Sequence, residues 1–351
     1  MNSSAAFWRG TLKKAMETIG GTVNLMEVCG SHSLAIAKFG LRALLPERLR
    51  LLSGPGCPVC VSGARFIDNA IALSRNGIKV AVFGDLLRIP GSEGTLQNER
   101  ELLVIYSPEE ALDYAKAHPA EEVVLAAVGF DPTLCAGAAV LEEARKSGAE
   151  NFSMLVDFKR IRPVLDDLAH DPKTKLNGFI LPGHVASVTG EQGFAGLSLP
   201  GVISGFTAEN ILHSIFLLLQ LTGKKETAVI NNYPQMVSPG GNRTALELIG
   251  QYFEPVSGEW RGIGIVDGGC WKIREEYARF DASVKYHLEN TGVVRSPAGC
   301  RCGDVLRGYL RPAECPLFAK QCTPEHPVGA CMVSGEGACA AFYRYREWKA
   351  C

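Results

Sequence analysis

The residues of this chain best able to do chemistry are its twelve cysteines. Cys29, Cys57 and Cys60 lie near the start of the 351-residue sequence, while Cys135 and Cys270 are isolated. The other seven lie near the end: Cys300, Cys302, Cys315, Cys322, Cys331, Cys339 and Cys351. In a reducing compartment, clustered cysteines are more often metal ligands or redox groups than structural disulfides. The sequence therefore predicts thiol chemistry at both ends of the chain.

The first group combines a single cysteine with a Cys-x-x-Cys motif. Cys29 stands in MEVCGSHS, close to His32, and Cys57 and Cys60 stand in SGPGCPVC. Two thiols at this spacing can close a small disulfide ring or chelate a soft metal. If Cys60 begins a helix, the helix dipole lowers the pKa of its thiol. The alternative is that these cysteines are buried and behave as small apolar side chains.

The C-terminal group has the composition of a segment held together by metal. From Cys302 to Cys339, successive cysteines are separated by 13, 7, 9 and 8 residues, which does not match a zinc finger. Intervening proline and glycine residues provide a path along which four thiolates can wrap a cubane iron–sulfur cluster. All-sulfur ligation suits zinc equally well, so a structural zinc site remains an alternative. Disulfides are a third alternative, which a reducing cytosol disfavours.

Alternating strands and helices must position these cysteines. From about residue 20 to 230, short apolar runs alternate with amphipathic segments, a pattern typical of parallel sheets with right-handed crossovers. The expected strands are 78–83, 123–128, 152–156, 178–181, 202–204 and 228–230. The expected helices are 64–74, 108–117, 136–147, 161–168 and 208–221. Ligands in such folds bind at loops that follow the strands, and the candidate loops are 84–95, 129–134, 181–187 and 231–242.

The predicted fold class is α/β, with one parallel sheet on either side of about residue 145. After about residue 290 the regular pattern fades, which predicts a small, irregular, cysteine-rich domain held by a metal or cluster. The net charge is −1, from 36 basic and 37 acidic residues, which argues against nucleic acid as the main partner. The sequence has no run of 18 apolar residues and no secretory signal at its start. We therefore expect a cytoplasmic protein that does not contact membranes.

Several longer motifs follow one another along the chain. They are MEVCGSHS, LLSGPGCPVCV, VFGDLLRIPGSEGTL, NFSML, LPGHVASVTG, the pair WRG and RFDA, and CRCGDVLRG…CPLF…CTPEHPVGACMVSGEGACAA. Together they resemble the hydrogenase maturation factor HypD family, in the same order and over nearly the whole chain. GPGCPVC and the C-terminal block are the most specific of these motifs.

The resemblance implies a role in building the iron centre of [NiFe] hydrogenase, an iron that carries cyanide and carbon monoxide, Fe(CN)2CO. The family does this in complex with the small chaperone HypC, and HypE donates the cyanide. We expect a monomer that forms such heterocomplexes. The implied domains are residues 20–145 with Cys29 and the Cys57/Cys60 pair, residues 146–290 as a second α/β domain, and residues 1–19 with 291–351 carrying a [4Fe–4S] cluster.

Carried over by position, the resemblance also implies roles for single residues. Cys29 would ligate the Fe(CN)2CO iron beside His32, and Cys57 and Cys60 would be a redox-active pair between the two α/β domains. With the cluster, this pair can relay the two electrons that cleave a carbon–sulfur bond in a thiocarboxamide-like donor. The implied cluster ligands are Cys302, Cys315, Cys322 and Cys339, with Cys300 in reserve, while Cys331 and Cys351 look dispensable. His32 and His184 are either functional groups near the iron or ordinary loop histidines.

Some loops depart from the family pattern. The chain reads GFDPTLCAG where most members read GFETTAP, so its acidic residue there is Asp131. NNYPQMVSPGGN and VDGGC also stand in place of family motifs. The N-terminal thiols and the cluster motif are intact, which predicts that the redox and iron chemistry persists. The changed loops bear on the surface that HypC and HypE contact. The hypothesis that follows is a divergent paralogue that serves a particular hydrogenase or a different iron centre.

Two other classes of function fit the cysteines. A free-standing iron–sulfur dithiol oxidoreductase predicts activity that does not need Cys29. A zinc-stabilised binding module predicts a colourless protein that is unaffected by Cys57→Ser.

Overall fold

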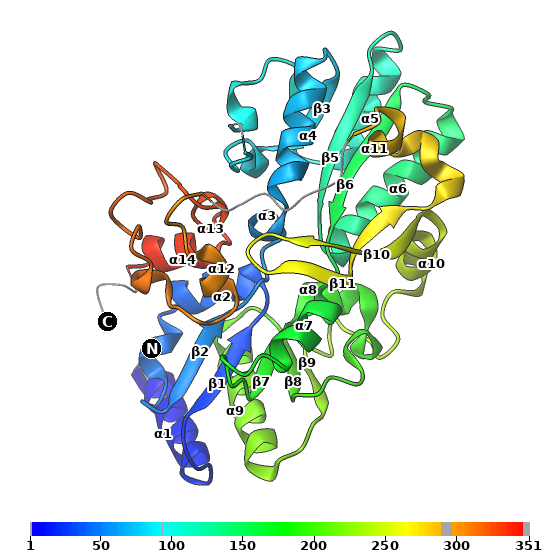
Figure 1. Ribbon diagram of the computed structural model, residues 1–351. Coiled ribbons are helices and arrows are strands. Elements are labelled where there is room, and N and C mark those ends of the chain that lie inside the picture. Colours follow the sequence, from blue (N-terminus) through cyan, green and yellow to red (C-terminus); the bar gives the residue numbers. More distant parts are fainter. Residues whose placement is uncertain (1, 93, 289–296, 347–351) are drawn as a thin grey trace.

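The computed structural model describes residues 2–92, 94–288 and 297–346. Cys351, which we expected to be dispensable, lies outside these residues. The described chain forms two parallel sheets, an antiparallel hairpin and a cysteine-rich segment that lies beside them (Figure 1). Within those residues, no helix combines the length and apolar character that crossing a membrane requires.

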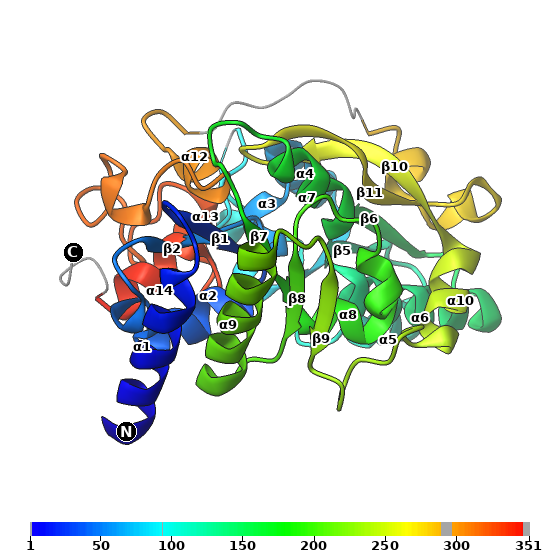
Figure 2. The same cartoon turned by 90° about the horizontal axis from the view of Figure 1, so that it is seen from below.

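Sheet A is a five-stranded parallel sheet with the order β2-β1-β7-β8-β9. Its strands are β1 (Val23–Glu27), β2 (Leu49–Ser53), β7 (Gly178–Pro182), β8 (Gly201–Ser204) and β9 (Val229–Asn232). Two helices, α1 (Asn2–Glu17) and α9 (Ala208–Lys224), cover one face, and their apolar side chains share a core with β1 and β7 (Figure 2). The side chain of Thr207 begins α9 by accepting a hydrogen bond from the backbone of Asn210.

Sheet B is a four-stranded parallel sheet with the order β4-β3-β5-β6. Its strands are β3 (Lys79–Phe83), β4 (Leu102–Ile105), β5 (Val123–Gly129) and β6 (Phe152–Phe158), and its helices are α4 (Ala64–Arg75), α5 (Pro108–Ala117) and α6 (Asp131–Ser147). Every residue of β5 is buried, as is typical of a central strand covered on both faces. A capping box between Ser107 and Glu110 begins α5, and Gly148, with a left-handed φ of 68°, ends α6.

An antiparallel hairpin crosses the region between the two sheets (Figure 1). It consists of β10 (Phe253–Trp260) and β11 (Gly264–Ile273). The other helices of the α/β part are α2 (Gly30–Lys38), α3 (Pro58–Val61), α7 (Ile161–Ala169), α8 (Gly183–Thr189), α10 (Arg243–Tyr252) and α11 (Ala282–Lys285). Short 3-10 turns are η1 (Leu41–Leu44), η2 (Gly84–Leu86), η3 (Leu96–Asn98), η4 (Glu191–Phe194) and η5 (Glu275–Phe280).

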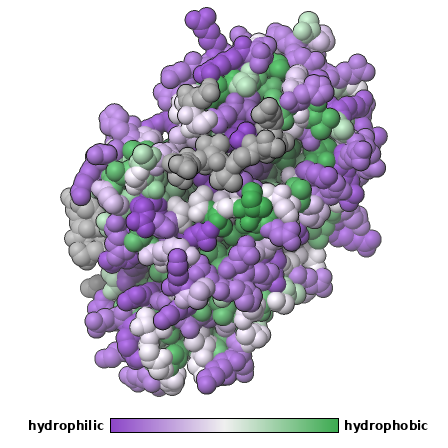
Figure 3. Space-filling view, in the orientation of Figure 1, coloured by the Kyte–Doolittle hydropathy of each residue, from purple (hydrophilic) through white to green (hydrophobic). Residues whose placement is uncertain are grey.

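The cysteine-rich segment consists of short helices joined by turns. They are α12 (Cys302–Leu306), η6 (Pro312–Glu314), α13 (Ala330–Val333) and α14 (Ala338–Arg344). Helix α14 packs on α2, and α13 packs on α3. The cysteine-rich segment therefore lies against the helix that follows Cys29 and the helix that carries Cys60. The face of the molecule seen in Figure 3 is largely hydrophilic, with apolar residues gathered near its centre.

The α/β class and all six predicted strands are confirmed, but the division of the sheets at about residue 145 is wrong. Sheet A joins β1 and β2 to β7, β8 and β9, so residues from both expected halves form one sheet. The order of strands along the sequence does not fix which strands are neighbours in a parallel sheet. After each crossover connection, the chain can add its next strand at a different position in the sheet. Trp8 and Leu12 of helix α1 pack in the core beside sheet A. We expected residues 1–19 to belong with the cysteine-rich segment instead.

Candidate redox and metal site

The carboxyl edge of sheet A gathers several of the predicted site residues. All its strands run in the same direction, so the loops that follow them share one edge. Cys29 follows β1, Cys57 follows β2, His184 follows β7 and Phe206 follows β8. The structure thus brings together residues that lie far apart in the sequence.

Cys29 lies in a tightly packed position at this edge. A Cβ atom on Gly56 would lie 2.1 Å from the Cys29 nitrogen, so only glycine lets the Cys-x-x-Cys loop approach this closely. The Cys29 backbone donates to a carboxylate oxygen of Glu27, 3.2 Å away. Burial raises the pKa of the Cys29 thiol to about 12, and the charges of Glu336 and Glu27 add to this rise. The isolated thiol is therefore neutral at pH 7, and a bound cation would favour the thiolate.

His32 and His184 both stack on the aromatic ring of Phe206. The Phe206 centroid lies 4.8 Å from that of His32 and 4.0 Å from that of His184. His32 is fully buried, and its Nε2 lies 3.1 Å from the carbonyl of Gly205, which makes Nε2–H the donor. Burial lowers the pKa of His32 to about 4, so the ring is neutral and Nδ1 carries a lone pair. This Nδ1 is buried without a hydrogen-bond partner among the described residues.

Two carboxylates that we did not single out from the sequence lie at the same site. Glu336, from the cysteine-rich segment, accepts a hydrogen bond from Ser31 at 2.7 Å. Its negative charge favours the protonated forms of Cys29, His184 and Asp85. Asp85 lies in the candidate loop after β3, whereas Glu336 lies in the motif VSGEGAC and gave no other signal.

The Cys-x-x-Cys pair lies at the start of α3. Cys57 is the N-cap, and Cys60 is the third residue of the helix rather than its first. Our expectation of a lowered pKa at Cys60 is wrong, because full burial raises the pKa of its thiol. The thiol of Cys60 donates to the sulfur of Cys57, with 2.6 Å between the two sulfurs. Both thiols are buried, and their sulfurs are close enough to interconvert with a disulfide.

Cys331 connects this pair to the C-terminal cysteines. Cys331 lies on α13, which packs against the helix that carries Cys60. Interactions with the neighbouring thiols of Cys302 and Cys60 lower its pKa. We expected Cys331 to be dispensable; the structure places it between the Cys-x-x-Cys pair and the other C-terminal cysteines. Spacing alone did not indicate this position, because it depends on the packing of α13 against α3.

A small cavity lies within the cysteine-rich segment. Its lining residues are Cys300, Cys302, Cys315, Leu317, Phe318, Cys322, Gly329, Cys331, Met332 and Cys339. A Cβ on Gly329 would lie 2.5 Å from the Cys300 sulfur, so glycine is needed in this wall. Burial raises the pKa of the Cys339 thiol, and four neighbouring cysteines add to this rise. The walls therefore contain all four expected cluster ligands, the reserve ligand and Cys331.

The donor set of this cavity fits an iron–sulfur cluster. Such a cluster needs four thiolates, and six cysteines line the cavity. In the described chain, no three His, Cys, Asp or Glu side chains are already gathered at single-ion distances. The thiols instead surround a space, which suits a polynuclear group whose thiolates bind different metal atoms. Cys315, Cys322 and Cys339 would provide three ligands, and Cys302 or Cys300 the fourth.

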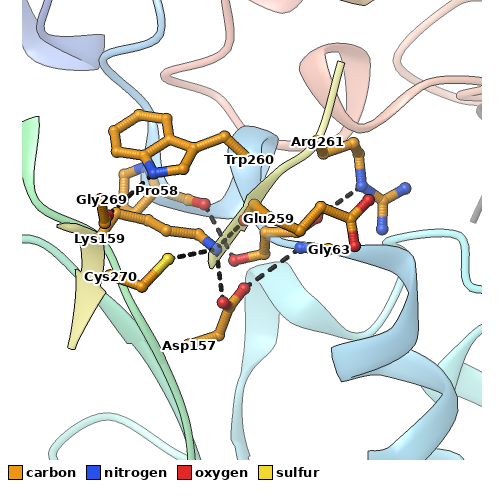
Figure 4. A network of polar contacts seen from close by, with 10 residues as sticks. Pro58, Gly63, Asp157, Lys159, Glu259, Trp260, Arg261, Gly269 and Cys270 are labelled. Atoms are coloured by element: carbon orange, nitrogen blue, oxygen red, sulfur yellow. Dashed lines mark hydrogen bonds and ion pairs between the residues drawn. The ribbon is translucent and has the colours of Figure 1, made fainter. Parts of the chain in front are cut away.

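A buried polar network beneath the site links sheet B, the hairpin and the Cys-x-x-Cys segment (Figure 4). The Nζ of Lys159 donates to Asp157 and to the carbonyl of Glu259, both at 2.5 Å. Asp157 also accepts from the backbone of Gly63 at 3.2 Å, and the Cys270 sulfur lies 3.6 Å from Lys159. Cys270 thus belongs to this network, and Cys135 lies on α6, so neither lines the cysteine cavity.

Replacing Lys159 by methionine is expected to lower the free energy of unfolding by about 3 kcal/mol, because it leaves the Asp157 carboxylate without its buried cation. Chemical denaturation measures this loss. The matched control is Lys272→Met, which breaks an exposed pair with Glu254 and should cost less than about 1 kcal/mol. Equal losses in the two variants would contradict a structural role for the network.

The fold and the site define a class: an α/β protein that presents a buried dithiol to a cysteine-lined cavity. Comparison with known proteins makes the assignment specific. Residues 6–346 match the family HypD, described as "Hydrogenase formation hypA family", and the chain belongs to this family.

Curated relatives resemble the chain over almost its full length. A putative hydrogenase expression/formation protein of Methanocaldococcus jannaschii is 37% identical, over 97% of this chain and 98% of the relative. The hydrogenase maturation factor HypD of Cupriavidus necator is 37% identical, over 94% of this chain and 91% of its own. HypD of Escherichia coli is 36% identical, over 93% and 90% respectively. The resemblance predicted from the motifs is thereby confirmed, and the chain is a hydrogenase maturation factor.

Proposed function

We propose that this chain carries a [4Fe–4S] cluster and, with a HypC-like chaperone, forms the scaffold on which an Fe(CN)2CO unit is assembled. The observation that carries the proposal is a series of neighbouring thiols: Cys57 contacts Cys60, the helix of Cys60 packs on α13, and Cys331 of α13 lines the cavity together with Cys302. Its other end lies beside Cys29, because Gly56, which precedes Cys57, packs against the Cys29 backbone. Electrons stored at the cavity could thus reach the site of iron chemistry through adjoining sulfurs.

The cluster, when bound, supplies electrons one at a time. The residues of this chain supply its environment. The cavity lining includes Leu317, Phe318 and Met332 beside the thiols, and such apolar walls limit access of water. The backbone of Val328 donates to the sulfur of Cys322 at 3.4 Å, which stabilises negative charge on that sulfur.

The dithiol pair supplies two electrons to each cyanide transfer. A HypE-like protein would present the cyanide as a thiocyanate-type group, R–S–CN. Oxidation of Cys57 and Cys60 to a disulfide releases two electrons and two protons, which convert R–S–CN to R–SH and HCN. The carbon–sulfur bond breaks, the sulfur–sulfur bond forms, and the cyanide carbon becomes available to the iron. Re-reduction of the disulfide through Cys331 and Cys302 would complete the cycle.

The iron cargo would be held at Cys29. A thiolate is a soft ligand suited to an iron with strong-field ligands, and a thiolate of the HypC-like partner would supply a second one. His32 and His184 are both neutral at pH 7, since burial lowers the pKa of each. His184 can take the proton that HCN loses when its carbon binds the iron, and Glu336 lies within electrostatic reach of His184 to stabilise the resulting cation. His32, with its pKa of about 4, is a much weaker base.

Single serine substitutions identify the fourth cluster ligand. With Cys302 as ligand, Cys302→Ser should lower bound iron at least about tenfold, because removing a ligand is expected to cost no less than removing a supporting residue. Cys300→Ser would then leave the iron content near normal. The opposite result would assign Cys300 as the ligand and would leave Cys302 and Cys331 as a second dithiol. Iron and sulfide analysis after anaerobic purification distinguishes the two assignments.

The partner assignment is tested by co-purification from the native host. Recovery of a stable complex with an ordinary HypC-like protein supports the scaffold function and contradicts the hypothesis of a different iron centre. A zinc-containing protein without sulfide would contradict the cluster and favour the binding module. A cluster-containing protein that reduces disulfides and never binds iron at Cys29 would favour the oxidoreductase.

A further inference from the structure

The tip of the hairpin places a buried arginine between the dithiol helix and the cysteine cavity. Arg261 directly follows β10 and is only 5% exposed. Its backbone donates to the carbonyl of Val61 at 2.8 Å, and its Nε donates to the carbonyl of Ser62 at 2.6 Å. One terminal nitrogen, Nη1, donates to the carbonyl of Pro90 at 2.8 Å. Figure 4 shows the side chain extending away from Lys159, so Arg261 is not part of that ion pair.

The other terminal nitrogen of Arg261 has no partner among the residues that the structure describes. Nη2 is buried and makes no hydrogen bond within the described residues. A buried N–H of a charged group that is left unpaired carries the full cost of its lost hydration. The structure therefore contains a buried guanidinium, held by two carbonyl oxygens, whose remaining N–H groups require an acceptor.

The cysteine cavity lies next to this donor. Gly262 follows Arg261 and packs so tightly on Gly303 that an added Cβ would lie 2.6 Å from the Gly303 Cα. Gly303 in turn follows Cys302. The charge of Arg261 acts on Cys302 and Cys300 and favours their thiolate forms. The acceptor that Nη2 lacks is therefore expected on the cavity side.

We propose that Arg261 donates a hydrogen bond from Nη2 to a sulfur of the iron–sulfur group in the cysteine cavity and thereby raises its reduction potential. This inference rests on the proposed function. Reduction adds one electron and one negative charge to the group and breaks no bond. A fixed cation with an N–H directed at sulfur stabilises the reduced form more than the oxidised form. Burial strengthens this interaction, because little water screens the charge.

The position of Arg261 gives the inference its functional meaning. The same guanidinium whose charge acts on Cys302 and Cys300 is bonded to Ser62, just after the helix that carries Cys60. A change in charge at the cavity would therefore alter the electrostatic potential at the segment that carries the dithiol. Arg261 would set the potential at which electrons enter the dithiol.

Two substitutions distinguish the effect of the Arg261 charge from a role of Arg261 in anchoring the hairpin tip. Arg261→Gln retains hydrogen-bond donors but removes the charge, whereas Arg261→Lys retains the charge. The matched control is Arg307→Gln, because Arg307 also donates to carbonyls of the hairpin tip, at Gly262 and Ile263, but is partly exposed. All variants are purified anaerobically as full chains, and iron, sulfide and the EPR-monitored reduction potential are measured.

In Arg261→Gln, the ratio of reduced to oxidised cluster at the wild-type midpoint potential should fall about tenfold, equivalent to about 59 mV for a one-electron couple. Arg261→Lys should recover most of this shift, and the control should stay near the wild-type value. An unchanged potential in an iron-replete Gln variant would overturn the inference. Loss of iron in both Arg261 variants would also overturn it, by assigning an anchoring role. Absence of iron and sulfide from the wild-type chain would instead refute the proposed function itself.

Discussion

Cys29→Ser is expected to abolish loading of the Fe(CN)2CO unit while the cysteine cavity keeps its iron. The serine hydroxyl is a hard, neutral ligand that does not replace a thiolate on iron with strong-field ligands. We expect at least about a hundredfold loss of bound iron–cyanide signal, the upper end of the loss for a residue that only supports a ligand. Infrared spectroscopy of the complex with a HypC-like protein measures it, together with iron and sulfide analysis.

The matched control for this variant is Cys135→Ser. Cys135 is half-buried on α6, away from both cysteine groups. It should retain the infrared bands and the full iron content. Cyanide and carbonyl bands of normal intensity in Cys29→Ser would refute the assignment of Cys29 as the iron ligand and favour the oxidoreductase function.

Cys60→Ser is expected to stop cyanide transfer without releasing the cluster. The remaining Cys57 thiol has no partner for an intramolecular disulfide, so the pair can no longer supply two electrons. Cys60 also provides the contact to Cys331, so the same change interrupts the series of sulfurs. We expect the rate of cyanide transfer to fall by at least about a thousandfold, comparable to the removal of a residue essential to catalysis.

Transfer from a cyanide-loaded HypE-like protein, followed by mass spectrometry of the donor, measures this effect. Cys270→Ser is the control, because Cys270 is buried in the polar network of Lys159 rather than at the cavity. It should transfer cyanide at close to the normal rate. Normal transfer by Cys60→Ser would show that the electrons come from elsewhere and would contradict the role of the dithiol.

Much of the local structure could be predicted because buried strands of parallel sheets are continuous apolar runs. The run 123–128, for example, corresponds to the fully buried β5. The strands β1 and β2 were not predicted, because polar and charged residues such as Asn24 and Arg50 interrupt their apolar runs. Their pairing with β7 depends on contacts between residues far apart in sequence, which periodicity does not encode.

The residue types of the site could be predicted from the sequence, but the contacts between those residues could not. Cysteine type and spacing indicated the thiols, and the loop after β7 indicated His184. Glu336 and Arg261 could not be found in this way, because each acts on thiols distant from it in sequence. The place of Cys331 between the dithiol and the cavity could not be predicted for a related reason, since it comes from the packing of α13 on α3.

The most direct test of the central claim is anaerobic purification with iron and sulfide analysis, followed by infrared spectroscopy with and without a HypC-like partner. The scaffold function predicts about four iron atoms and four sulfides per chain before loading, plus cyanide and carbonyl stretching bands from the loaded complex. A cluster without these bands in any complex would contradict the scaffold function. Zinc without sulfide would contradict both the cluster and the electron path through Cys331.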